Sequence, residues 1–75
     1  MNVILSKIGS RIREIRMNRN MTQNELANVC NFEKANLSRI ESGRTNVTIR
    51  SLQRISKALE IDIAKLFEED LERTA

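Results

Sequence analysis

The stretch Thr22–Gly43, TQNELANVCNFEKANLSRIESG, carries the pattern of two short helices separated by a tight turn. Thr22 and Glu25 form a Thr-x-x-Glu capping box, so we expect a helix over residues 23–30. Asn31 stands where the chain must then reverse, and Asn is one of the few residues besides glycine that tolerate a positive φ. The stretch therefore predicts a helix that begins and ends at identifiable residues.

The second half of the stretch predicts another helix, over about residues 34–42, with Gly43 as a left-handed cap after it. The side chains expected to face inward from the two helices are Leu26, Ala27, Val29, Cys30, Phe32, Leu37 and Ile40. The side chains expected to face outward from the second are Lys34, Asn36, Ser38 and Arg39. Two helices that cross at a short turn, the second with polar and cationic side chains exposed, can enter a DNA major groove.

Apolar residues recur every three or four positions in the rest of the chain, which predicts three further helices. The first covers about residues 6–19, and Thr48 and Asp62 cap the fourth and fifth. Their apolar stripes are Ile8, Ile12 and Ile15; Ile49, Leu52, Ile55 and Leu59; and Ile63, Leu66 and Phe67. The sequence predicts one all-α domain over residues 1–75, with its core at about residues 6–71 and its helix-turn-helix at about residues 22–43.

The composition excludes several classes of site. The 75 residues include no histidine and one cysteine, so no zinc site and no intrachain disulfide are possible. Because Cys30 is expected to face inward and no phosphate-binding glycine loop is present, no reaction centre is expected, and the protein is predicted not to be an enzyme and to need no cofactor. The single cysteine, the absence of a signal peptide and the absence of a long apolar run predict a cytoplasmic protein that does not contact membranes.

Charge is divided unevenly along the chain. Residues 1–59 contain 11 Lys and Arg against 4 acidic residues, a balance of +7, whereas residues 60–75 contain 2 against 6, a balance of −4. A basic body with an acidic tail suits a surface that binds DNA and keeps its far end away from phosphate. Ordinary surface charge would also produce a moderate excess.

The chain resembles the helix-turn-helix of the phage repressor and Cro family, also called the XRE family. The matching residues are Thr22-Gln23, Glu25-Leu26-Ala27, Leu37-Ser38-Arg39-Ile40-Glu41-Ser42-Gly43, Arg44-Thr45-Asn46, Leu52, Ile55 and Ala58-Leu59. The resemblance covers about residues 8–67 and implies a compact five-helix, lambda-repressor-like DNA-binding domain. Asn31 replaces the usual glycine, Glu33 the usual Ser or Thr cap, and Val47 a frequent proline. None of these is a core position, so the expected fold is unchanged.

The candidate base-reading residues lie on the outward face of the second helix of this motif, where its first turn and the next meet base edges. They are Lys34, Ala35, Asn36 and Arg39. Arg39 can bind O6 and N7 of guanine with its two-pronged guanidinium, and Ala35 can meet a thymine methyl. Lys34 and Asn36 reach either a base or a phosphate. The neighbouring Glu33 either accepts from cytosine N4 or opposes the approach of DNA.

The candidate phosphate-binding residues flank this helix. Gln23 opens the preceding helix, where unpaired N–H groups and the helix dipole favour an anion, and the resemblance implies that it holds a backbone phosphate. Thr22 is expected to act first as a cap. The full set is Thr22, Gln23, Ser38, Ser42, Arg44, Thr45 and Asn46. The resemblance also implies an ion pair between Arg16 and Glu41 that joins the first helix to the end of the recognition helix.

The end of the chain suggests a self-association surface. Ile63 and Leu66 are suited to closing the monomer core, which leaves Phe67 as the bulkiest uncovered apolar residue. We expect the dimer interface at Phe67, Leu71 and Ile63. The alternative is that Phe67 is buried entirely within its own subunit.

Together these observations predict a sequence-specific regulator of transcription that binds double-stranded DNA as a homodimer, through the major groove of a roughly palindromic operator. Regulation would come from occupying a promoter or from contact with RNA polymerase. The same features also fit the controller protein of a restriction–modification system. A third interpretation is the antitoxin, or protein-interaction module, of a toxin–antitoxin pair, with a toxin protein as the partner.

Overall fold

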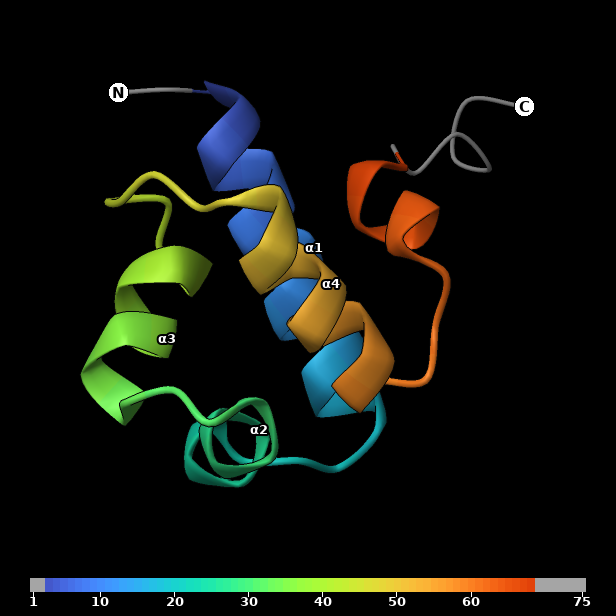
Figure 1. The fold of residues 1–75 in the computed structure, drawn as a ribbon. Helices are drawn as coiled ribbons and strands as arrows, with labels where there is room; N and C mark the ends of the chain where they lie inside the picture. Colours follow the sequence, from blue (N-terminus) through green and yellow to red (C-terminus); the bar gives the residue numbers. More distant parts are fainter. Residues whose placement is uncertain (1–2, 69–75) are drawn as a thin grey trace.

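The computed structural model describes residues 3–68 and contains four α-helices followed by a 3-10 helix. The elements are α1 (Val3–Asn18), α2 (Gln23–Cys30), α3 (Lys34–Glu41), α4 (Ile49–Ala58) and the 3-10 helix η1 (Ile63–Phe67). Contacts between them close a ring around the core: α1 touches α3, α3 touches α2, α2 touches α4, α4 touches η1, and η1 returns to α1 (Figure 1). This ring holds the helix-turn-helix, α2 with α3, at one side of the molecule.

The predicted all-α class is confirmed, but the prediction of five α-helices is wrong by one. The last element is a 3-10 helix of five residues. Asp62 starts it, because its Oδ1 accepts from the Ala64 N–H at 2.9 Å and its carbonyl accepts from the Lys65 N–H at 2.9 Å. So short a segment has room for few i→i+4 bonds, and the buried Leu66 ties it to the core, so the tighter turn prevails.

The helix boundaries are otherwise close to those expected. α2 begins and ends at the expected residues, whereas α1 begins at Val3 rather than Ser6 and ends at Asn18 rather than Arg19. No residue between Val3 and Ser6 breaks a helix, which accounts for the earlier start. α3 ends at Glu41, with Ser42 as its C-cap.

The core is built from the predicted apolar stripes. Its buried members are Ile8, Ile12, Leu26, Ala27, Cys30, Leu37, Ile40, Leu52, Ile55, Leu59 and Leu66. The prediction that Val29 and Ile49 face inward is wrong, because Val29 is 64% exposed and Ile49 is 61% exposed. Val29 lies about 100° around α2 from the centre of its buried face. Ile49 is the first residue of α4, and the inner face of that helix is formed one turn later by Leu52, Ile55 and Ser56.

Two turns depend on unusual backbone geometry. Asn31 has φ 60°, as expected for the reversal between α2 and α3, and the next N–H, of Phe32, bonds the Ala27 carbonyl at 2.8 Å. Gly43 has φ 74°, and a Cβ at this position would meet the backbone of Ser6 at 2.8–2.9 Å. Gly43 therefore permits both the left-handed cap after α3 and the close approach of α1.

Within residues 3–68, no helix is both long enough and apolar enough to cross a bilayer. In the same part of the chain, Cys, Asp and Glu side chains do not gather in groups of three that would hold a metal ion.

Candidate nucleic-acid interface

The N-terminus of α2 is fixed by reciprocal capping. Thr22 Oγ1 accepts from the Glu25 N–H at 3.0 Å, and Glu25 Oε1 accepts from the Thr22 N–H at 2.8 Å. This is the capping box expected from the sequence. It holds Gln23 at the first position of α2, at the positive end of the helix dipole.

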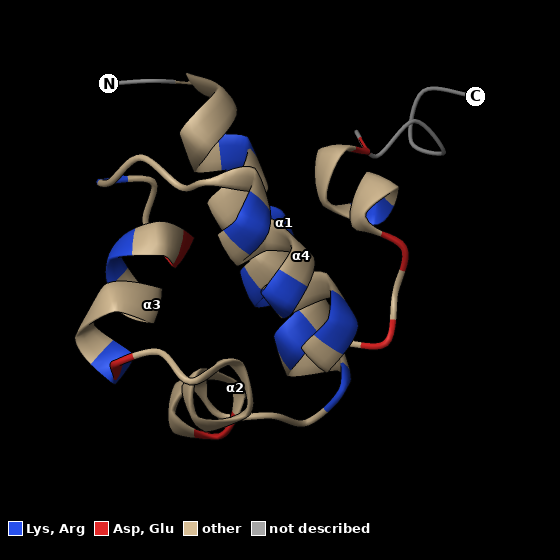
Figure 2. Cartoon of the chain, in the orientation of Figure 1, with Lys and Arg blue, Asp and Glu red and all other residues tan. Residues whose placement is uncertain are grey.

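Helix α3 has one buried face and one open face. Leu37, Ile40 and Glu41 are buried, and the candidate base readers Lys34 and Arg39 are exposed. Ala35 is exposed beside Lys34, whereas Asn36 and Ser38 are half-buried. The N-cap residue Glu33 makes no side-chain cap bond, so its carboxylate stands exposed next to Lys34. The open face thus presents cations near both ends of the helix, with one acidic group at its start (Figure 2).

The loop after α3 is held by its own polar side chains. Ser42 Oγ donates to the Arg39 carbonyl at 3.1 Å and accepts from Arg44 Nε at 3.0 Å. Thr45 Oγ1 donates to the Asn46 carbonyl at 3.4 Å. Arg44 and Asn46 are exposed and Thr45 is half-buried. These contacts bring the guanidinium of Arg44 beside the C-terminal end of the face that carries Arg39.

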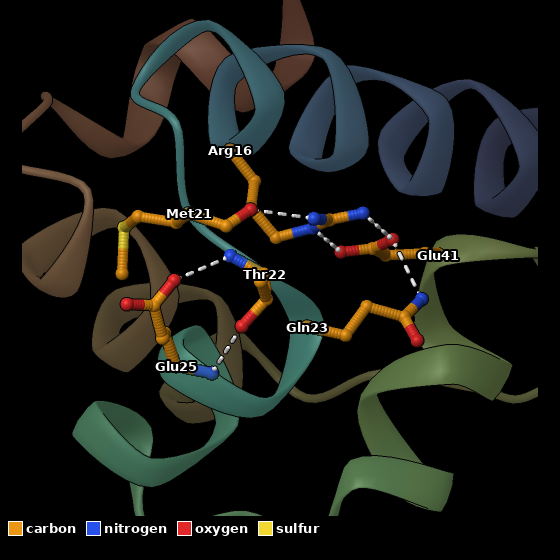
Figure 3. Close-up of polar contacts among 6 residues, drawn as sticks. All are labelled: Arg16, Met21, Thr22, Gln23, Glu25 and Glu41. Carbon is orange, nitrogen blue, oxygen red and sulfur yellow. Dashed lines mark hydrogen bonds and ion pairs between the residues drawn. The ribbon is translucent and has the colours of Figure 1, made fainter.

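The pairing of Arg16 with Glu41 is present in the structure, and it is buried. Arg16 Nε donates to Glu41 Oε2 at 2.8 Å and Nη2 donates to Oε1 at 3.1 Å, which gives the two-pronged geometry of the strongest such pairs. The side chains are 9% and 3% exposed. The remaining prong, Nη1, donates to the Met21 carbonyl at 2.7 Å (Figure 3). One arginine of α1 therefore fixes both the entry to α2 and the end of α3.

A contact that the sequence did not reveal joins this pair to the candidate phosphate-binding set. Gln23 Nε2 donates to Glu41 Oε1 at 3.0 Å (Figure 3). The two residues are 18 positions apart, on different helices, so no periodic pattern signals their contact. Only the crossing of α2 and α3 brings them together.

Within residues 3–68, most Lys and Arg residues belong to α1, α3 and α4, and Glu69, Asp70 and Glu72 of the expected acidic tail lie outside the described residues. Lys and Arg occur along α1 and α4 and near both ends of α3, whereas Glu60 and Asp62 mark the connection to η1 (Figure 2). The acidic residues of this connection lie away from α3.

Cys30 belongs to the core rather than to a reactive site. It is 4% exposed, and its Sγ donates to the Arg54 carbonyl at 3.7 Å. Burial raises the pKa of the Cys30 thiol, with Arg54 acting in the opposite direction. A protonated buried thiol is a poor nucleophile, which agrees with a structural role.

The candidate dimer residues divide between core and surface. Phe67 is 49% exposed, so complete burial within its own subunit, the alternative considered from the sequence, is wrong. Ile63 is partly buried and packs against the core, and Leu71 lies outside the described residues. Arg11 holds η1 against α1, because its Nε donates to the Lys65 carbonyl at 3.0 Å.

Comparison with known proteins places these features in a family. Residues 12–66 match the helix-turn-helix family HTH_3. The control protein C.BamHI of Bacillus amyloliquefaciens is 39% identical over 59 residues, which cover 77% of this chain and 73% of that protein. The immunity repressor of Bacillus phage phi105 is 33% identical over 63 residues, which cover 84% of this chain and 44% of the repressor.

Solved structures agree in fold. The restriction–modification controller protein C.Esp1396I superposes with a TM-score of 0.82 at 37% identity, covering 89% of this chain and 87% of that chain. The same controller has been crystallised as a tetramer in complex with its natural 35 base-pair operator. The chain therefore belongs to the HTH_3 family of helix-turn-helix, DNA-binding transcriptional regulators.

Proposed function

We propose that the protein binds a roughly palindromic operator as a homodimer and inserts α3 of each subunit into the major groove. The observation that carries this proposal is the open face of α3, which exposes Lys34, Ala35 and Arg39 while Leu37 and Ile40 anchor the helix in the core. A helix fixed on one side and cationic on the other has the form that enters a major groove.

The open face divides into base-reading and phosphate-binding parts. We assign base contacts to Lys34, Ala35, Asn36 and Arg39, with Arg39 on guanine. The phosphate-binding residues flank them on either side: Thr22, Gln23 and Ser38, and then Ser42, Arg44, Thr45 and Asn46. In this arrangement, the phosphate contacts fix the position of α3, and the four base readers supply the sequence preference.

The proposal of a homodimer is supported by exposed apolar side chains at the end of the molecule opposite α2. Phe67 is 49% exposed, and Ile4 and Ile49, at the beginnings of α1 and α4, are 64% and 61% exposed. The beginnings of α1 and α4 and the helix η1 lie toward one end of the molecule in Figure 1. Single exposed apolar residues are ordinary, but several at one end favour a self-complementary contact.

A role as the controller of a restriction–modification system is the specific form of regulation that we favour. Two controllers, C.BamHI and C.Esp1396I, share 39% and 37% identity with this chain. The phage repressor shares a lower identity of 33%.

Selection of bound sequences from a random DNA pool tests this function. The dimer should enrich two related half-sites in opposite orientation, with centres about one helical turn, ~34 Å, apart. Enrichment of a single unpaired half-site would contradict the homodimer, and failure to enrich any sequence would contradict specific binding.

Sedimentation of Phe67→Ala at micromolar concentration tests the interface. We expect a folded monomer that loses affinity for the operator far more than for unrelated DNA. A dimeric Phe67→Ala variant would move the interface elsewhere, and Val29→Ala, at an exposed apolar residue of α2, serves as the matched control.

A further inference from the structure

At the junction of α1, α2 and α3, Glu41 accepts a hydrogen bond from Gln23 in addition to its ion pair with Arg16. Glu41 Oε1 accepts from Arg16 Nη2 at 3.1 Å and also from Gln23 Nε2 at 3.0 Å. Glu41 is 6% exposed, whereas Gln23 is half-buried and stands at the first position of α2. One buried carboxylate thus connects the ion pair to a side chain at the edge of the DNA-binding face.

The chemistry of this carboxylate determines the orientation of the Gln23 amide. An ionised carboxylate only accepts hydrogen bonds, whereas an amide has one donor end and one acceptor end. Turning the amide oxygen of Gln23 toward Glu41 would place two acceptors against each other. Figure 3 shows the nitrogen of Gln23 directed at Glu41 and its oxygen directed away.

This orientation has a consequence for an anion at the start of α2. The amide nitrogen carries two hydrogens, and Glu41 uses one of them. The second is left for a phosphate oxygen at the helix N-terminus, where the dipole also favours negative charge. Arg16 compensates the charge of Glu41, which would otherwise repel a phosphate bound nearby.

We propose that Glu41 is a positioning residue for DNA binding: it fixes the amide of Gln23 by accepting one hydrogen of its nitrogen, which leaves the second hydrogen available to the operator backbone. Arg16, Glu41 and Gln23 then form one network that links the orientation of α3 to the phosphate contact at α2. This inference rests on the proposed function, because it assigns Gln23 to a phosphate.

Affinity measurements in two backgrounds test the network. The first background is the wild type, and the second is Arg16→Met/Glu41→Leu, which replaces the buried pair by apolar side chains of similar size and removes the acceptor for Gln23. Gln23→Ala should weaken DNA binding about tenfold in the wild type and about twofold or less in the second background. Arg44→Ala, at a residue that contacts Ser42 and not Glu41, should weaken binding by the same factor in both.

Two outcomes would overturn the proposal. If Gln23→Ala has the same effect in both backgrounds, Glu41 does not orient Gln23. If Arg44→Ala also loses its effect in the second background, the pair acts by holding the whole motif together, and no separate positioning role exists. Circular dichroism establishes that the variants are folded, and Arg16→Leu/Glu41→Met, which also removes the acceptor for Gln23, replaces the second background if that variant does not fold.

Nuclear magnetic resonance of the side-chain amides gives a second readout that needs no DNA. The chain has two glutamines, and the exposed Gln53 serves as the internal control for Gln23. One Gln23 amide proton should be shifted downfield and exchange more slowly than those of Gln53, and both effects should be lost in Arg16→Met/Glu41→Leu. Identical behaviour of the two glutamines would overturn the network, whereas failure of the wild type to bind any duplex would overturn the proposed function.

Discussion

The helix-turn-helix, α2 with α3, and the scaffold, α1 with α4 and η1, differ in what fixes their geometry. The scaffold is held together mainly by the burial of apolar side chains. Four of them are at most 2% exposed: Ile12, Leu52, Ile55 and Leu59. Helix α3 is also anchored by apolar residues, but its end is joined to α1 and α2 through Glu41.

The two kinds of contact control different features of helix packing: how close two helices lie and at what angle they cross. Apolar burial is roughly proportional to the area removed from water and has little directional preference, so it brings helices together without setting their angle closely. The two-pronged pairing of Arg16 with Glu41 has a defined geometry. The helix that must match a DNA groove is therefore held by a buried two-pronged ion pair, whereas the hydrogen bond from Arg11 to the Lys65 carbonyl in the scaffold is exposed.

The largest expected effect comes from breaking those directional contacts. Glu41→Ala should lower the free energy of unfolding by about 3–5 kcal/mol, because it leaves the Arg16 guanidinium buried without its carboxylate. Arg16→Ala and Glu41→Ala should combine non-additively in urea denaturation, since both break one interaction. A coupling free energy of zero between the two substitutions would show that the pair does not act as a unit.

The stability of the scaffold should fall when a buried apolar side chain is truncated. Ile55→Ala should lower the free energy of unfolding by about 2–5 kcal/mol, because Ile55 is fully buried and its truncation leaves a cavity. Met17→Ala, at an apolar residue of α1 outside the proposed dimer contact, is the control and should change stability by less than about 0.5 kcal/mol, since Met17 is 55% exposed. Equal losses in thermal or urea denaturation would contradict the burial of α4 described above.

Substitutions of the exposed DNA-binding residues should change DNA binding without changing the fold. Arg39→Ala is expected to cost about 1–3 kcal/mol on the preferred site and to remove preference at one base position. Gln23→Ala and Arg44→Ala should instead weaken binding to all sequences alike, as loss of phosphate contacts does. Competition binding with single-base operator variants measures the difference, and full preference retained by Arg39→Ala would remove Arg39 from the base readers.

The smallest effect is expected at a turn outside the helix-turn-helix. Glu60 has φ 59°, a left-handed conformation that disfavours most side chains, so Glu60→Gly should raise the free energy of unfolding by about 1 kcal/mol. Its exposed pairing with Arg19, at 3.3 Å, offsets little of that gain. Asn31→Gly, at φ 60°, should gain less, because Asn tolerates this region. A larger gain at Asn31 in thermal denaturation would contradict this ranking.

Local signals predicted much of this molecule. The capping box at Thr22 and the helical period of Leu26 and Cys30 fixed the bounds of α2, and Asn31 marked the left-handed turn. These features depend on residues a few positions apart, which a sequence displays directly. The resemblance added the pairing of Arg16 with Glu41, which composition alone does not reveal.

The errors arose where tertiary packing overrides a local pattern. Ile49 continues the apolar spacing of α4 but lies beyond the part of the helix that packs, and Val29 lies at the side of α2. The segment after Asp62 has an apolar stripe too short to establish an α-helix. The bond between Gln23 and Glu41 depends on how two helices cross, which no spacing in the sequence encodes.

Protection of guanine N7 from methylation tests the central claim, that α3 reads bases in the major groove, because N7 is exposed only there. On a selected operator, we expect two protected clusters separated by about one helical turn, with one guanine in each cluster losing its protection in Arg39→Ala. Specific binding without protection of N7, or protection that Arg39→Ala leaves unchanged, would contradict the account.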